Sequence, residues 1–226
     1  MNHFKHCLLS VLCLGLFLSS ATAKVAASDT MSIPTEETVK APETLVGEVT
    51  EKREVNIKTF LTSEYRYQAY IYPNAVHYKV NGKYADIDNR LVESQSDNTL
   101  LENTANSFKI KFAKNTNASK IVSFSAGTLG FSWRFVGINK TFVSIDNNES
   151  RKQDTLTDIS NTQSMALYSD AFLNTDLQYI LDGDKLKENF ILKAKGAPST
   201  FTQSIAIQQG SVTEENGKIV FKDKEI

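Results

Sequence analysis

Cysteine and histidine are scarce in this sequence, and their positions limit its chemistry. Cys7 and Cys13 both lie in an apolar run near the N-terminus, so the chain beyond residue 23 contains no thiol. That part can form neither a disulfide nor a thiolate metal site. His3 and His6 precede the same run, which leaves His77 as the one histidine downstream. A catalytic triad or zinc site built on His77 would need partners that no local motif supplies.

Charge of one sign and long apolar runs are also lacking. The formal net charge is −1 and no long basic run occurs, so we expect neither nucleic acid nor anionic membrane as a partner. No second long apolar segment follows the N-terminal one, so we expect no membrane association after that segment is removed.

The N-terminus has the pattern of a secretory signal peptide over 1–23. Lys5 precedes the apolar run Cys7–Ser20, and Ala21-Thr22-Ala23 offers small residues at a cleavage site. The run is shorter than the roughly 20 residues of a membrane-spanning helix, which weighs against an anchor. Leu12 before Cys13 weighs against lipid attachment. We predict cleavage after Ala23 and a secreted, extracellular product, with association with the cell wall as one expectation.

Residues 24–55 differ in composition from the rest of the chain. They are rich in threonine, glutamate and alanine and contain Pro34 and Pro42, with no aromatic residue before Lys52. Such a segment buries too little apolar surface to offset the entropy lost on ordering. It is interpreted as a disordered leader or linker.

The remaining chain alternates apolar and polar residues with a period of two, which indicates half-buried strands. Asn81-Gly82, Asp182-Gly183 and Asn216-Gly217 fall between such segments and predict tight hairpins. The predicted fold class is all-β, with antiparallel sheets and one or two sandwich-like lobes. A lobe over 56–150 and a second β-rich segment over 151–226, incomplete at its C-terminus, are expected. The alternating apolar positions are Phe108, Ile110 and Phe112; Leu129, Phe131, Trp133 and Phe135; Leu177, Tyr179 and Leu181; and Phe201, Ile205, Ile207, Ile219 and Phe221.

No residue is predicted to be catalytic, cofactor-binding or metal-ligating, and no cofactor is expected. His77 is interpreted as a structural strand residue. The acidic groups Asp86–Asn89, Asp146–Glu149 and Asp182–Asp184 contain calcium-type oxygen ligands, but lack EF-hand spacing and have the composition of β-turns. A pair of carboxylates acting on a glycoside stays open, because its members can be distant in sequence.

Several blocks in order resemble a known family. They are Lys58–Leu61, Tyr67–Pro73, Val76–Tyr78, Asn81–Tyr84 with Ile87–Asn89 and Leu91, Asn106–Lys114, Leu177–Tyr179, Gly183-Asp184, Leu186–Leu192 and Gly217–Phe221. Together they are similar to the N-terminal region of bacterial secreted YD-repeat proteins of the Rhs and wall-associated type. The YD repeats and the C-terminal toxin of that family have no counterpart here, so a fragment of a longer protein is one expectation.

The resemblance implies a non-catalytic structural or interaction module of a cell-surface protein, active in contact or toxin delivery. Its partners would be a cell-wall polymer or other domains of a YD-repeat protein, with no nucleic acid. The alternative is a module that binds carbohydrate or cell-wall polymer through its tyrosines, and a hydrolase ranks third. On this interpretation the chain is not an enzyme.

Overall fold

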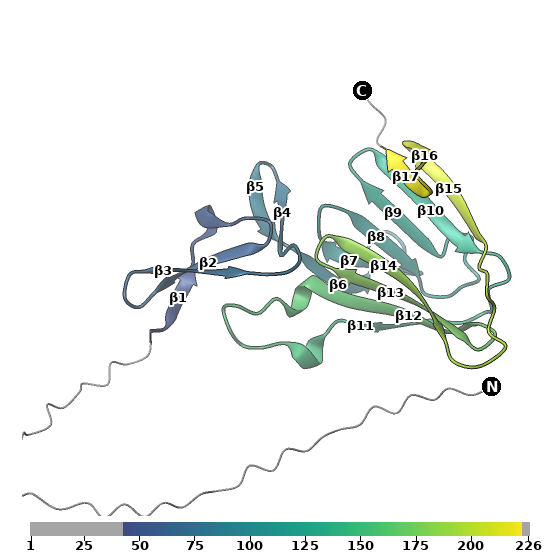
Figure 1. The fold of residues 1–226 in the computed structure, drawn as a ribbon, viewed down its shortest axis with the longest axis horizontal. Helices are drawn as coiled ribbons and strands as arrows, with labels where there is room; N and C mark the ends of the chain where they lie inside the picture. The colour runs from purple at the N-terminus through teal and green to yellow at the C-terminus, as the bar shows by residue number, and fades with distance from the viewer. Residues whose placement is uncertain (1–42, 223–226) are drawn as a thin grey trace, which may run out of the picture. The chain divides into compact units, whose positions relative to one another are not determined.

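A computed structural model describes residues 43–222 of the chain. The predicted signal peptide over 1–23, and residues 24–42 of the predicted leader, lie outside the described residues. The described part consists of strands β1 to β17 and three short 3-10 turns, with every strand pair antiparallel. The predicted all-β fold is confirmed (Figure 1). No helix within 43–222 is long and apolar enough to cross a membrane.

The first part of the described chain carries a three-stranded sheet and a separate hairpin. The sheet order is β1-β2-β3, and β4 pairs only with β5. Their bounds are β1 Leu45–Glu48, β2 Ile57–Thr62, β3 Tyr67–Ile71, β4 His77–Val80 and β5 Lys83–Asp86, with a 3-10 turn η1 at Thr50–Lys52.

A six-stranded sheet in the order β15-β10-β9-β8-β7-β6 faces a four-stranded sheet in the order β11-β12-β13-β14. A last hairpin, β16–β17, follows. The bounds in the larger sheet are β6 Asp88–Glu93, β7 Leu100–Ala105, β8 Lys109–Ala113, β9 Val122–Ala126, β10 Leu129–Phe135 and β15 Gln203–Gln209. Those of the others are β11 Val143–Asp146, β12 Gln163–Phe172, β13 Thr175–Asp182, β14 Lys185–Leu192, β16 Ser211–Glu215 and β17 Lys218–Lys222. Two further 3-10 turns, η2 Glu149–Arg151 and η3 Ser160–Thr162, lie between β11 and β12.

The core fills the space between these two sheets, as the alternation predicts. Phe112 and Phe135 from the larger sheet and Leu177 and Tyr179 from the smaller one are at most 1% exposed. Leu129 and Phe131 are half-buried, whereas Ile205 and Ile207 on the edge strand β15 are 44% and 40% exposed. An edge strand has a neighbour on one side only, so its apolar side chains are covered less completely.

Two buried tyrosines tie polar groups into this core. Tyr168 donates its hydroxyl to the Ala113 carbonyl at 2.7 Å. Tyr179 donates to Glu188 at 2.7 Å, and Trp133 donates its indole N–H to both Tyr179 and Glu188 at 3.1 Å. Burial raises the pKa of both tyrosines far above its usual range, so both hydroxyls stay protonated donors.

The predicted hairpins are present. Asn81 and Gly82 both have positive φ and join β4 to β5, and Asn216 and Gly217 do the same between β16 and β17. The β13–β14 turn begins one residue later than expected, because Asp182 pairs with Lys185 and the loop residues are Gly183 and Asp184.

The predicted domain bounds stay a prediction. Strand β1 and turn η1 lie inside the range expected to be a leader. Strand β11, before position 150, pairs with β12, after it. The Asn74 amide also donates to Asp182 at 2.8 Å across that position.

Candidate functional site

Five charged or titratable side chains converge where strands β1, β2, β4 and β5 meet. We call Glu48, Arg53, Lys58, His77 and Asp86 the His77 cluster. Hairpin β4–β5 sets His77 directly opposite Asp86. Glu48 ends β1, and Lys58 lies on β2, which pairs with β1. Four members of the cluster therefore lie on regular strands, which fix side-chain positions more tightly than loops do, and Arg53 follows turn η1.

The His77 ring is fully enclosed. Its side chain is 0% exposed, and Nδ1 lies 2.7 Å from the Glu54 carbonyl oxygen. A carbonyl only accepts, so the Nδ1–H donates and the proton of a neutral ring sits on that nitrogen. Nε2 has no hydrogen-bond partner among the described residues. It lies 3.5 Å from Glu48 Oε1 and 3.5 Å from Asp86 Oδ1, beyond good hydrogen-bond length.

Two cations neutralise the carboxylates of the cluster. Arg53 donates from Nε and Nη2 to Glu48, each at 2.8 Å, and from Nη2 to Asp86 at 2.9 Å. Lys58 donates to Asp86 Oδ1 at 2.9 Å. The pKa of Arg53 is raised, mainly by its hydrogen bonds to Glu48, although burial alone would lower it.

Asp86 is the member of the cluster that faces solvent, with 42% of its side chain exposed. The neighbouring His77 ring, and then Lys58 and Arg53, hold the pKa of its carboxyl well below the usual range, although burial raises it. Asp86 is therefore an anion at neutral pH. It can accept hydrogen bonds or bind a cation but is a weak base.

A pocket of about 420 Å³ adjoins the cluster through Arg53. We call it the Tyr84 pocket. The β4–β5 hairpin brings Tyr84 and Lys83 to it, and Lys79 places its ammonium 5.2 Å from the Tyr84 ring centre. Its lining residues are Thr50, Glu51, Arg53, Gly82, Lys83 and Tyr84. An aromatic ring beside the exposed ammonium of Lys83 suits a planar ligand that carries an anionic group.

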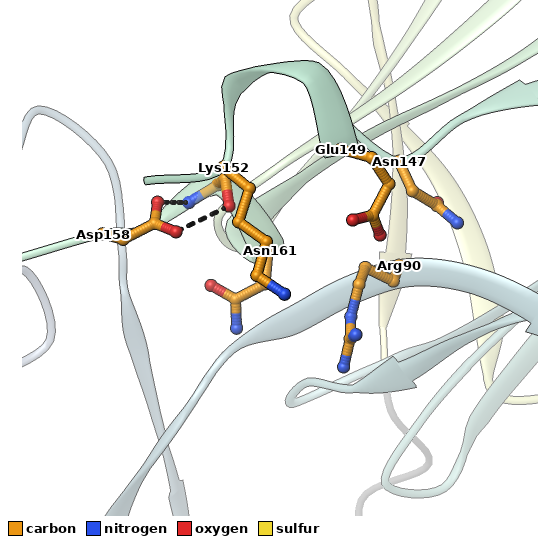
Figure 2. A pocket seen from close by; sticks show the side chains of 7 residues that line it. Arg90, Asn147, Glu149, Lys152, Asp158 and Asn161 are labelled. Carbon is orange, nitrogen blue, oxygen red and sulfur yellow. Dashed lines mark hydrogen bonds between the residues drawn. The ribbon is translucent and has the colours of Figure 1, made fainter. Parts of the chain in front are cut away.

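A second polar pocket, of about 200 Å³, lies between Arg90 and the loop that links β11 to β12 (Figure 2). Asp158 accepts hydrogen bonds from the Ser160 N–H and hydroxyl, at 2.8 and 3.1 Å. Burial opposes ionisation of Asp158, but these bonds and one from the Gln153 N–H outweigh it and lower its pKa. Arg90 is paired with Asp88. These bonded polar groups hold the loop in place. We therefore take the Tyr84 pocket as the better candidate for a functional site.

The predicted absence of site residues rested on a lone His77. The structure places His77 on a strand, as predicted, but brings Glu48 and Asp86 to it. Asp86 was interpreted as a turn residue, and Glu48 and Arg53 fall in the range interpreted as a leader. The two-residue Asn81-Gly82 turn was the available signal, because it fixes the register that sets Asp86 opposite His77.

Comparison with known proteins identifies relatives of one kind. The chain is 27% identical over 198 residues to the tRNA3(Ser)-specific nuclease WapA of Bacillus spizizenii, covering 84% of this chain. It is 25% identical over 183 residues to the tRNA nuclease WapA of Bacillus subtilis strain 168, covering 79% of this chain. The chain spans about 8% of the length of these relatives. No family model matches the chain, and no solved structure matches it significantly.

These names correct several predictions made from sequence. The relatives are named as nucleases, not as YD-repeat proteins, so the proposed resemblance to a secreted YD-repeat N-terminal region is wrong. Three predictions that followed from the resemblance are wrong as well: the non-catalytic structural module, its carbohydrate-binding alternative, and the assignment as a non-enzyme. The exclusion of nucleic acid is also wrong, since the relatives are named for action on tRNA. That exclusion relied on the net charge and on the lack of a long basic run, neither of which reports cations that the fold brings together.

Proposed function

We propose that this chain is part of a tRNA nuclease of the WapA type, and that its Tyr84 pocket contacts the RNA. The observation that carries the proposal is the match over 79% to 84% of the chain to proteins named for tRNA cleavage. The chain covers about 8% of those proteins, so the cleavage activity is proposed for the protein that carries it.

The Tyr84 pocket has the groups that an RNA strand requires. Tyr84 is half-buried, so part of its side chain is held by its neighbours and part stays accessible to a base. Stacking of one base on an aromatic side chain contributes about 1 to 3 kcal/mol. Lys83 is exposed at the hairpin, where its backbone pairs with Val80, and its side chain makes no hydrogen bond or ion pair with the other described residues, so its ammonium is available for a phosphate.

The charges around the pocket predict a modest salt dependence. Arg53 is already bonded to Glu48 and Asp86, and Glu51 adds a negative charge at the pocket wall. One phosphate contact through Lys83 corresponds to a slope of about −0.7 in log K against log salt for a single strand. We therefore expect RNA to be held here mainly by stacking and directed hydrogen bonds.

The test is the affinity of the full chain for unfractionated tRNA, measured by fluorescence anisotropy. Tyr84→Ala should weaken binding roughly 5- to 150-fold, the range that corresponds to one lost stacking contact. Lys83→Ala should weaken it less and flatten the salt dependence by about one phosphate.

Tyr67→Ala is a matched control. Tyr67 is exposed on β3 and also has a lysine over its ring, with Lys52 Nζ 4.7 Å from the ring centre, but it does not line the Tyr84 pocket. Its replacement should leave the affinity unchanged. Absence of tRNA binding by the wild-type chain, or equal effects of the two tyrosine variants, would show that the pocket is not the RNA contact.

A further inference from the structure

The unpaired nitrogen of His77 has a chemistry that RNA binding does not use. Nδ1–H is committed to the Glu54 carbonyl, so in the neutral ring the lone pair of Nε2 points into the His77 cluster. Buried polar atoms are nearly always satisfied, and an exception calls for an explanation such as a missing ion. Metal-binding histidines also commonly donate their other ring N–H to a carbonyl or carboxylate, which fixes the tautomer.

Three potential ligand atoms surround one point. His77 Nε2 lies 3.5 Å from Glu48 Oε1 and 3.5 Å from Asp86 Oδ1, and the three atoms all lie within 4.8 Å of one another. Ligands about 2.1 Å from a tetrahedral metal are about 3.4 Å apart. The two separations from Nε2 thus match the edge of a tetrahedral site, and the half-exposed Asp86 side chain is the one with room to adjust.

We propose that Glu48, His77 and Asp86 form a binding site for a divalent transition metal, and that Zn²⁺ is the ion that this set of ligands suits best. One imidazole and two carboxylates are a ligand set that zinc accepts, with a fourth position for a small molecule. An imidazole nitrogen disfavours magnesium and calcium, which prefer oxygen ligands throughout. This inference rests on the cluster alone and does not depend on tRNA.

Arg53 and Lys58 oppose the metal and set a limit on its affinity. Lys58 Nζ bonds the same Asp86 oxygen that faces His77, and Arg53 Nε bonds the same Glu48 oxygen. A carboxylate oxygen accepts more than one bond, so the arginine can stay, whereas the ammonium competes for the metal position. Lys58→Met should therefore tighten zinc binding, on the order of tenfold, because like charges repel strongly at a partly buried site.

The experiment titrates ZnCl₂ into the full chain, free of any histidine tag and stripped with EDTA, by isothermal calorimetry. We expect a site in the wild type that disappears in His77→Gln and in Asp86→Asn. Glu51→Gln is the charge-matched control and should keep it, because Glu51 lies nearby but outside the three ligands. His3, His6, Cys7 and Cys13 are present in every variant, so only the difference between variants is counted.

Long-range ¹H–¹⁵N spectra of the His77 ring give a second readout that does not rely on a buried variant folding. Zinc should shift Nε2 strongly and leave Nδ1 protonated. Three results would each show that the zinc site does not exist. They are equal zinc binding by wild type and Asp86→Asn, failure of both wild type and Lys58→Met to bind zinc, and an Nε2 signal that zinc does not shift. In the last case the ring faces the carboxylates without a metal.

Discussion

Replacing Tyr179 with phenylalanine removes one hydroxyl from the interface between the two large sheets. That hydroxyl donates to Glu188 at 2.7 Å and accepts the Trp133 indole N–H at 3.1 Å, inside a fully buried side chain. A hydrogen bond to a charged group contributes about 1.5 to 3 kcal/mol. Trp133 keeps its second acceptor on Glu188, so no buried donor is left without a partner. Tyr179→Phe should therefore lower the free energy of unfolding by about 1.5 to 3 kcal/mol.

Urea unfolding followed through Trp133, the one tryptophan of the chain, measures this loss. The charge on Glu188 is the source of the larger value, so the same substitution made in a Glu188→Gln background should cost only about 0.5 to 1.5 kcal/mol. The difference is the coupling energy of a double-mutant cycle. A cost below about 0.5 kcal/mol, or an equal cost in both backgrounds, would refute the role given to this hydrogen bond.

Two further predictions concern the loops. The pKa of Asp158 in the folded protein is lower than its ordinary value of 3.8. Its ionised carboxylate therefore contributes fully to the free energy of unfolding above pH 3.8, and this contribution is lost as the pH falls through the pKa of the folded state. The stability difference between wild type and Asp158→Asn should thus be constant near neutral pH and shrink below pH 3.8; a difference that grows on acidification would contradict this. Gly183→Ala should cost about 2 to 4 kcal/mol, because φ is +60° and the added Cβ would meet the Ala75 carbonyl oxygen at 2.6 Å. Gly217→Ala has a similar φ but open space, and in thermal melts it should cost no more than about 1 kcal/mol.

Local pattern was enough to predict the strands that form the core. Phe108, Ile110, Phe112, Trp133 and Phe135 are all buried, because alternation with a period of two places the apolar residues of each segment on the face of the six-stranded sheet that meets the core. The same pattern could not show which strands lie at an edge. Ile205 and Ile207 alternate as regularly as the core residues, yet are 44% and 40% exposed because β15 has a neighbour on one side only.

The candidate site was only partly within reach of the sequence. The Asn81-Gly82 turn sets Asp86 opposite His77, and that pairing follows from hairpin geometry. Glu48 joins them through pairing of β1 with β2 and the packing of that sheet, which no local spacing records. Arg53 follows a 3-10 turn in a segment whose composition resembles a linker. Contacts between segments distant in sequence depend on tertiary structure, which composition does not determine.

The most direct test of the central claim is tRNA cleavage by the protein that carries this chain, measured over a range of tRNA concentrations for wild type, Tyr84→Ala and Tyr67→Ala. If the Tyr84 pocket contacts the RNA, Tyr84→Ala should raise KM roughly 5- to 150-fold with kcat unchanged, and Tyr67→Ala should match wild type. Absence of tRNA cleavage by the wild-type protein, or a KM that Tyr84→Ala leaves unchanged, would contradict the account.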